Sequence, residues 1–248
     1  MASAESPQVF DYVVIGSGFG GAVSAMRLSE KGYRVLVLER GKRFEDQDLP
    51  RTNWNIWKFL WFPPLRCYGI MQISLIRGLM ALRWAAVGGG SLGYANVLEV
   101  PGDRLFEVQA WKNLADWKTI LTPHYETAKK MLGVVCNSNL READNVLKEI
   151  STEFGYGQTF RPVNVGVFFG PEGQDVPDPY FGGEGPPRRG CNFCGACMVG
   201  CRYNGKNTLM KNYLYFAEKR GVEVRPEAEV TDIRPLPSGQ SDGARYEV

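Results

Sequence analysis

The stretch Asp11-Tyr-Val-Val-Ile-Gly-Ser-Gly-Phe-Gly-Gly21 decides how this chain begins to fold. Its apolar residues Tyr12 to Ile15 have the length and character of a buried parallel strand. Gly16, Gly18 and Gly21 follow in G-x-G-x-x-G spacing, which allows a tight turn, a close approach to a pyrophosphate and close packing of the next helix on the strand. The helix would present free N–H groups and its positive dipole end to phosphates. The stretch therefore predicts a site for an adenine dinucleotide.

The residues after the glycine turn support this prediction. Apolar positions give the expected helix an inward face, and Gly32 can end it. Residues 34–38 form a second apolar strand that ends at Glu39. Glu39 follows Gly21 by 18 positions, close to the roughly 20 residues expected between the glycine motif and an acid that binds ribose. A solvated carboxylate at a strand end is the alternative interpretation of Glu39. The predicted cofactor site at this end of the chain comprises Gly16, Gly18, Phe19, Gly20, Gly21, Glu39 and Arg40.

Composition narrows the class of protein. The chain has 248 residues, 44% of them hydrophobic, which suffices for one large domain or two small ones with a sizeable core. The net charge is +2, and the absence of a basic block argues against a nucleic-acid partner. The first seven residues lack the pattern of a secretory signal, so we expect a cytoplasmic protein.

Residues 46–85 are rich in apolar and aromatic side chains. They do not predict a membrane span, because Pro63-Pro64, Arg66, Arg77 and Arg83 interrupt the segment well short of the ~20 apolar residues that a span needs. A core or lid segment is one interpretation. The other is an apolar substrate wall, or an interfacial face through which a lipid-like substrate enters.

A second glycine-rich loop follows this segment, at Val87-Gly88-Gly89-Gly90-Ser91-Leu92-Gly93. Two such loops favour FAD over NAD, because an extended FAD needs separate stretches of backbone for its pyrophosphate and its flavin. Glycines allow the second loop to pass close to the cofactor. An ordinary flexible turn is the alternative for this loop taken alone.

Later parts of the chain predict further elements. We expect helices over 123–132, beginning at Thr122-Pro123, over 141–154, and over 208–220. Residues 161–190 hold many prolines and glycines and predict an irregular excursion. Residues 222–234 predict a strand, a turn and a strand, and 243–248 resemble the start of another strand. We therefore expect the chain to be a fragment.

Four of the six cysteines lie together as Cys191-x-x-Cys194-x-x-Cys197-x-x-x-Cys201. This is the spacing of a ferredoxin iron–sulfur loop, although Arg202 stands where the ferredoxin run has proline. A 4Fe–4S cluster, a zinc ion, and thiols or disulfides with a packing role all remain open, and Cys136 could replace Cys201 as a ligand. We hypothesise that a cluster here would carry electrons from reduced FAD to a protein acceptor.

Several of these motifs resemble the glucose–methanol–choline (GMC) oxidoreductases, most closely their cholesterol-oxidase-like branch. The run Gly16-x-Gly18-x-x-Gly21 through Val35-x-Val37-x-Glu39 is similar to the FAD-binding start of such flavoenzymes. Ala86-Val-Gly-Gly-Gly-Ser-Leu92, followed by Tyr94-Ala-Asn96 and Pro101, resembles the second signature of the family.

The resemblance implies a reaction and a set of contacts. Members of the family transfer a hydride from an alcohol carbon to flavin N5, and a histidine with a second His or Asn takes the hydroxyl proton. Those catalytic residues are expected beyond Val248, and His124 is interpreted as a surface or capping residue. The resemblance also implies that Gly88, Gly89, Gly90, Ser91 and Asn96 approach the flavin. Val230 would contact the adenine through its backbone, with a core strand as the alternative.

The expected fold class is α/β, with a three-layer Rossmann-like FAD-binding domain of the GMC type interrupted by substrate-domain segments. The FAD-binding parts would be residues 1–45, 86–102 and 221–248. Residues 46–85 would form an apolar lid or substrate segment, and 103–220 a helical and irregular substrate segment that carries the cysteines at 191–201.

The expected function is oxidation of a bulky apolar alcohol, such as a sterol, by an FAD enzyme that passes electrons to O₂ or to a redox protein and contacts membranes peripherally. A flavo-iron–sulfur electron-transfer module, an inactive FAD-binding fragment and a nicotinamide-linked dehydrogenase are the alternatives.

Overall fold

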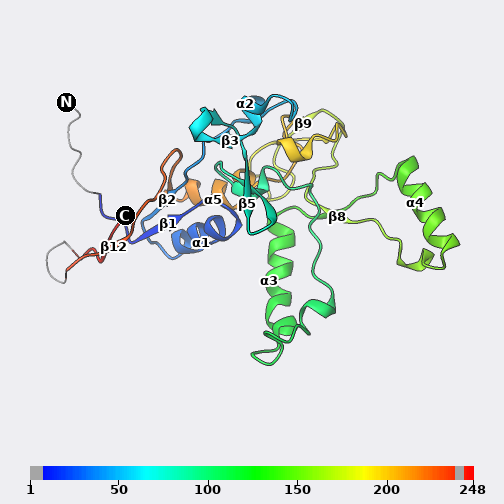
Figure 1. Ribbon diagram of the computed structural model, residues 1–248, viewed down its shortest axis with the longest axis horizontal. Coiled ribbons are helices and arrows are strands. Elements are labelled where there is room, and N and C mark those ends of the chain that lie inside the picture. Colours follow the sequence, from blue (N-terminus) through cyan, green and yellow to red (C-terminus); the bar gives the residue numbers. More distant parts are fainter. Residues whose placement is uncertain (1–7, 238–242) are drawn as a thin grey trace.

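The computed structural model describes residues 8–237 and 243–248 (Figure 1). The prediction that residues 1–7 lack a secretory signal concerns residues outside the described ranges. The helices are α1 (Phe19–Glu30), α2 (Ile56–Phe59), α3 (Trp117–Met131), α4 (Glu142–Glu153) and α5 (Tyr213–Lys219). The strands are β1 (Tyr12–Ile15), β2 (Val35–Leu38), β3 (Trp61–Phe62), β4 (Cys67–Tyr68), β5 (Met71–Ile76), β6 (Leu79–Trp84), β7 (Val135–Cys136), β8 (Asn164–Val165), β9 (Asp175–Val176), β10 (Arg188–Arg189), β11 (Glu223–Arg225), β12 (Arg234–Pro235) and β13 (Tyr246–Glu247).

A three-stranded parallel sheet in the order β1-β2-β11 forms the nucleotide-binding part. The predicted strand–turn–helix–strand start is confirmed, with Tyr12 paired to Val35 and Ile15 to Leu38. Helices α1 and α5 pack against each other and share one hydrophobic core with β2 (Figure 1). That core contains Ala22, Ala25, Met26, Val35, Val37, Leu209, Tyr213, Leu214, Phe216 and Ala217.

The other side of β1 carries exposed apolar side chains, including Val13 and Ile15. A parallel sheet is normally covered on both faces. The described residues therefore supply the sheet and one helical layer of the predicted three-layer α/β domain.

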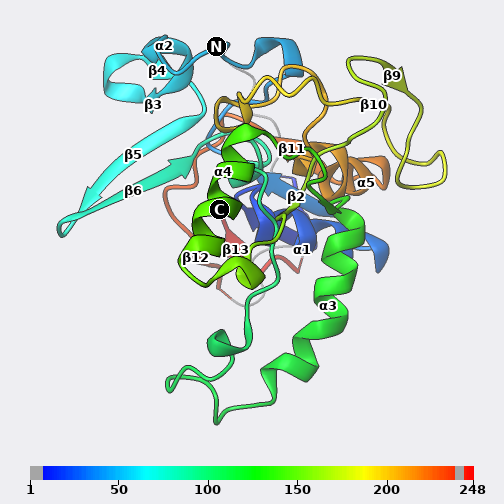
Figure 2. The same cartoon turned by 90° about the vertical axis from the view of Figure 1, so that its right-hand side faces the viewer.

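The segment 46–85 leaves the nucleotide-binding part after Lys42 and returns at Ala86, where the two residues form a parallel β-bridge. It folds into the hairpins β3–β4 and β5–β6 over a small core that it shares with the second glycine loop, built from Leu49, Phe59, Ile70, Met71, Ala86 and Leu92. The β5–β6 hairpin projects from the body (Figure 2). Leu75 and Leu79 near its tip are 82% and 72% exposed. The base of the segment is packed, as a core or lid segment would be. Its end is apolar and exposed, as an interfacial face would be.

Helices α3 and α4 extend away from the nucleotide-binding part, and neither has a buried residue (Figure 1). The prediction of a helix over 141–154 is confirmed by α4. The predicted start of the other helix at Thr122-Pro123 is wrong, because α3 begins at Trp117, where the Asp116 carboxylate accepts from the Thr119 N–H at 3.2 Å. His124 is therefore an exposed residue in the middle of α3 and caps nothing.

The predicted helix over 208–220 is interrupted. A 3₁₀ turn, Leu209–Lys211, comes first, and α5 begins only after Asn212, whose side chain accepts from the Tyr213 N–H. The buried residues of α5 are Tyr213, Leu214, Phe216 and Ala217. Among the described residues, no helix combines the length and apolar character that crossing a bilayer demands.

Candidate functional site

The first glycine loop forms an open cradle at the start of α1. Gly16 has φ +87° and donates to the Leu38 carbonyl at 2.8 Å, and a Cβ on Gly21 would lie 1.9 Å from the Gly16 oxygen. A Cβ on Gly18 or Gly20 would meet nothing within 4 Å. No side chain caps α1 at Gly18, so its first N–H groups face free space. Backbone donors beside open space suit a pyrophosphate.

Glu39 is buried and faces this loop. One carboxylate oxygen accepts from the Ser17 N–H at 3.0 Å and from the Ser17 hydroxyl at 2.7 Å, and the other accepts from the Gly41 N–H at 3.0 Å. The alternative of a merely solvated carboxylate is wrong, because only 6% of Glu39 is exposed. The acid therefore lies where the loop and the end of β2 meet, as a ribose-binding acid would.

The second glycine loop packs directly on the first. Gly89 has φ +49°, and a Cβ there would lie 2.8 Å from the Gly18 Cα. Gly88, at φ +94°, donates its N–H to the Ser17 hydroxyl at 3.0 Å. The loop is an ordered 3₁₀ turn over Gly89–Ser91, so the interpretation as a flexible turn is wrong.

The side chains of Ser91 and Arg40, which were predicted to contact the cofactor, contact other parts of the protein. The Ser91 hydroxyl donates to the Gly88 carbonyl at 2.7 Å and accepts from the Leu209 N–H at 3.0 Å, so it fixes the loop. The Arg40 guanidinium lies 4.4 Å from the centre of the Trp61 ring and donates to Gln72. Arg40 thereby joins the end of β2 to the 46–85 segment.

Val230 and Phe19 flank the cradle at its two ends. Val230 follows β11 and lines a cavity of about 370 Å³ together with Leu38 and Thr231, at the carboxyl end of β2. Ala228 donates to the Glu39 carbonyl at 2.9 Å, which keeps this stretch beside the acid and excludes the core-strand alternative. Phe19 is the first residue of α1, and its ring meets the Tyr94 ring edge-on, with 6.2 Å between centroids.

These residues fit FAD. A long dinucleotide places its pyrophosphate at a helix start, where it needs open space and N–H donors, and Gly18 and the start of α1 offer both. The buried Glu39 and the second loop, which packs on the first, suit the rest of such a molecule. FAD is thus the cofactor that the cradle suits.

Asn96 points to the cysteine loop, in contrast to the predicted flavin contact. It has φ +69°, is 5% exposed, and donates through Nδ2 to the Cys197 sulfur at 2.7 Å. Its Oδ1 is buried without a hydrogen-bond partner in the part of the chain that the structure describes. Asn96 therefore links the end of the second glycine loop to the cysteines.

Lys206 makes the same link more extensively. Lys206 is 2% exposed. Its ammonium donates to the carbonyls of Leu92 and Tyr94 at 2.7 Å each and to the carbonyl of Cys197 at 2.9 Å. Burial lowers the pKa of Lys206 to about 7, although nearby Cys197 and Cys201 act in the opposite direction. One side chain thus holds the second glycine loop against the cysteine loop.

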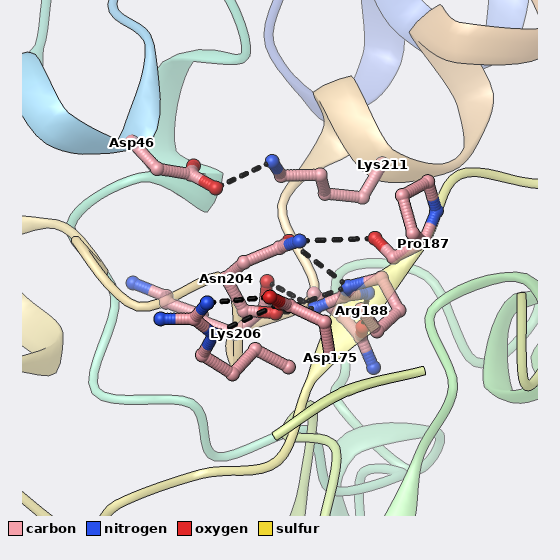
Figure 3. A network of polar contacts seen from close by, with 9 residues as sticks. Asp46, Asp175, Pro187, Arg188, Asn204, Lys206 and Lys211 are labelled. Carbon is pink, nitrogen blue, oxygen red and sulfur yellow. Dashed lines mark hydrogen bonds and ion pairs between the residues drawn. The ribbon is translucent and has the colours of Figure 1, made fainter. Parts of the chain in front are cut away.

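Arg188 is a second buried cation close by (Figure 3). It donates to the carbonyl and side-chain oxygens of Asn204, to the Lys206 carbonyl at 2.8 Å and to the Asn207 side chain. Burial lowers its pKa. At the edges of the network, Asp175 pairs with Arg189, and Lys211 pairs with Asp46 (Figure 3).

The four clustered cysteines line one cavity of about 450 Å³, together with Asn96 and Lys206. Burial raises the pKa of the Cys191 and Cys197 thiols. Within residues 8–237 and 243–248, no three Cys, His, Asp or Glu side chains are grouped closely enough to hold a single metal ion. Cys67 and Cys136 lie apart from this cavity.

Sequence reasoning missed Ser17, Arg188 and Lys206. Ser17 lies inside the glycine motif, where only the glycines carry a recognised signal. Lys206 and Arg188 are charged residues in a polar, glycine-rich stretch, which usually indicates a solvated surface.

Comparisons with known proteins agree with this site. Residues 14–44 match the family described as an NAD(P)-binding Rossmann-like domain. The chain is 54% identical over 226 residues to a cholesterol oxidase of Mycobacterium tuberculosis, which covers 89% of this chain and 39% of that protein. It is 47% identical over 244 residues to a cholesterol oxidase of Acinetobacter baumannii, covering 96% and 44%. A long-chain-alcohol oxidase, FAO3, of Arabidopsis thaliana is 28% identical over 229 residues, covering 86% and 25%.

The fold and the glycine site define a dinucleotide-binding protein of the Rossmann type. More narrowly, the chain is similar over most of its length to cholesterol oxidases, in agreement with the resemblance of its motifs to the GMC oxidoreductases. It spans less than half the length of the curated relatives that it matches.

Proposed function

We propose that this chain is the FAD-binding portion of an oxidoreductase that removes a hydride from the CH–OH group of a bulky apolar alcohol, such as a sterol. The single observation that carries the proposal is the contact between the two glycine loops at Gly18 and Gly89, beside the buried Glu39. The names of the relatives, cholesterol oxidase and long-chain-alcohol oxidase, support the substrate class.

The residues of this chain bind and orient the cofactor. The N–H groups at the start of α1 would hold the pyrophosphate, and Glu39 would accept from ribose hydroxyls while Ser17 and Gly41 keep it in place. Val230 would lie beside the adenine. When bound, the flavin accepts the hydride from the alcohol carbon.

The proton of the alcohol needs a separate acceptor. His124, the one histidine of the chain, is exposed on α3, which extends away from the glycine loops. We place the base beyond Val248. O₂ is the proposed electron acceptor, with a redox protein as the alternative.

The test uses the chain expressed alone and together with the coding region that follows it. Both products should bind FAD, and only the longer one should bleach its flavin when a sterol or long-chain alcohol is added without oxygen. Gly18→Ala should abolish flavin binding, because its Cβ would occupy the open space of the cradle at an ordinary φ of −66°.

Gly102→Ala is the matched control, since a Cβ there also meets nothing within 4 Å and φ is −69°. Protein that stays colourless in excess FAD would refute the cofactor assignment. A flavinated longer product that no alcohol bleaches would refute the reaction and favour a module that only transfers electrons.

We further propose that the β5–β6 hairpin contacts lipid, from which an apolar alcohol would be taken. The exposed Leu75 and Leu79, with Arg77 between them at the tip, support this proposal. Replacing both leucines by serine should reduce co-sedimentation with anionic phospholipid vesicles. The control is Leu114→Ser, at a residue 73% exposed elsewhere, and equal vesicle binding by all forms would refute the proposal.

A further inference from the structure

We propose that the cavity between the cysteine loop and residues 95–97 and 163–169 is the site of an iron–sulfur cluster held by Cys191, Cys194, Cys197 and Cys201. The proposal does not rest on alcohol oxidation, because it concerns a different ligand and a different part of the chain.

The cavity has suitable walls and volume. Its volume is about 450 Å³, and all four cysteines line it. They belong to a loop whose one regular element is the 3₁₀ turn Cys197–Val199. The remaining wall combines Phe169, Phe193 and several valines with polar side chains, among them Asn137, Asn139 and Arg141. Gly195 and Gly200, at φ +71° and +86°, give the loop its curvature. The apolar part of the lining would shield one side of a cluster, while the exposed Cys194 leaves another side open to solvent.

Two N–H groups already donate to these sulfurs. Asn96 Nδ2 donates to Cys197 Sγ at 2.7 Å, and the Phe193 backbone N–H donates to Cys191 Sγ at 3.4 Å. A neutral thiol is a weak acceptor, yet Asn96 makes this bond while its own buried Oδ1 has no partner in the described residues. This orientation suits a thiolate, and hydrogen bonds to ligand sulfurs are a feature of iron–sulfur sites.

The charges around the cavity call for an anion. Lys206 lines it and Arg188 supports Lys206 from behind, each 2% exposed. All their hydrogen-bond acceptors are carbonyl and amide oxygens, and among the described residues no carboxylate forms an ion pair with either. Buried cations without an anion are costly. A cluster with four thiolate ligands is negatively charged and would supply the missing partner.

The cysteine spacing and the size of the cavity are the basis for proposing a cluster in place of a single zinc ion. Zinc requires its sulfur ligands at about 2.3 Å from one point. Among the described residues no three ligand side chains are grouped in that way. Sulfurs distributed over the wall of a wide cavity can instead bind different corners of a cubane.

The experiment measures metal in the chain purified without oxygen and reconstituted with ferrous iron and sulfide. We expect about four iron and about four acid-labile sulfide per chain, and an electron paramagnetic resonance signal after reduction with dithionite. Cys194→Ser should lose most of the iron; because Cys194 is exposed, the fold should persist, as circular dichroism would show. Cys136→Ser, at an exposed cysteine outside the cavity, is the matched control and should retain it.

A second variant tests the contact with the glycine loop. Asn96→Gly preserves the positive φ and removes the N–H donor to Cys197, so its cluster should lose iron several-fold faster in air. About one zinc without sulfide, no bound metal at all, or loss of iron in Cys136→Ser would each overturn the proposal. Flavin content measured on the same samples separates its failure from that of the FAD site.

Discussion

Ser17 makes more contacts between segments than any glycine beside it. Its backbone and hydroxyl donate to Glu39, and its hydroxyl accepts from Gly88. It is fully buried. The first loop, the acid after β2 and the second loop are therefore joined through one small side chain.

We predict that Ser17→Ala weakens both stability and cofactor binding. The variant loses a donor to a buried carboxylate and leaves the Gly88 N–H without its acceptor, at a cost of about 2 kcal/mol. FAD affinity should fall about tenfold, because the two loops lose their connection. Urea unfolding and FAD titration measure the two effects.

Ser29→Ala is the control, since the Ser29 hydroxyl only donates to the Met26 carbonyl within the same helix. Equal FAD affinity in both variants would show that Ser17 does not position the site.

Individual site residues were predictable only where the signal is local. Gly16, Gly18, Gly21 and Glu39 follow one another at fixed spacing, and the structure brings them together. Asn96 was expected at the flavin because it follows the second loop. Its partner Cys197 lies 101 positions away, and no local pattern reveals such a contact.

The turn after β9 depends on one carboxylate. Asp178 accepts from the backbone N–H groups of Tyr180, Phe181, Gly183 and Gly185 at distances from 2.9 to 3.1 Å. Partial burial by itself raises the pKa of Asp178, but these four donors outweigh it and hold the pKa below its usual value. The turn is therefore an acid-sensitive part of the irregular region.

We predict that Asp178→Asn destabilises the chain by about 1–3 kcal/mol at pH 7. Because the folded-state pKa is lowered, the wild-type advantage is fully present above the unfolded pKa of about 3.9 and is lost as the pH falls through the folded value. Urea unfolding between pH 3 and pH 7 should show the two proteins converging in acid. Asp48→Asn, at an exposed carboxylate, should change little at any pH, and a constant difference for Asp178→Asn would contradict the linkage.

Helix boundaries were less predictable than helices. Proline favours the first turn of a helix, which explains the expected start at Pro123, but Pro123 lies inside α3. The Asp116 cap begins the helix earlier, and the Thr127 hydroxyl donates to the Pro123 carbonyl at 3.0 Å. In α5 the Asn212 cap delays the start. Caps compete along the chain, and the sequence does not rank them.

Taken together, the described parts form a packed centre with projecting arms. The surface area is 16088 Å², whereas a compact monomer of 27.7 kDa exposes about 11,000 Å². The glycine signatures predicted β1, α1 and β2 because these three elements of the centre are contiguous in sequence. The hairpins within 46–85 were not predicted: β5 alternates apolar and polar residues from Met71 to Leu75, but its partner β6 does not.

We predict strongly unequal hydrogen exchange across the chain. Amides of α1, β2 and α5 should exchange slowest, since these elements share the main core, and amides of α3 and α4 should exchange by local opening. Added FAD should slow exchange at 16–21 and 88–91. Helix α4 is the internal control and should not respond, and uniform protection would contradict this division.

The bridge between Lys42 and Ala86 has a consequence for how such chains diversify. The segment 46–85 leaves the nucleotide-binding part after Lys42 and returns to it at Ala86, and these two residues are adjacent. The Val87 N–H donates to the Lys42 carbonyl at 3.0 Å. A Cβ on Gly41 would lie 2.0 Å from the Ala85 oxygen, which leaves this junction little freedom. The projecting end of the β5–β6 hairpin (Figure 2) can therefore be lengthened, shortened or exchanged while the dinucleotide cradle keeps its shape, so a chimera that receives this tip from a distant homologue should still hold its coenzyme.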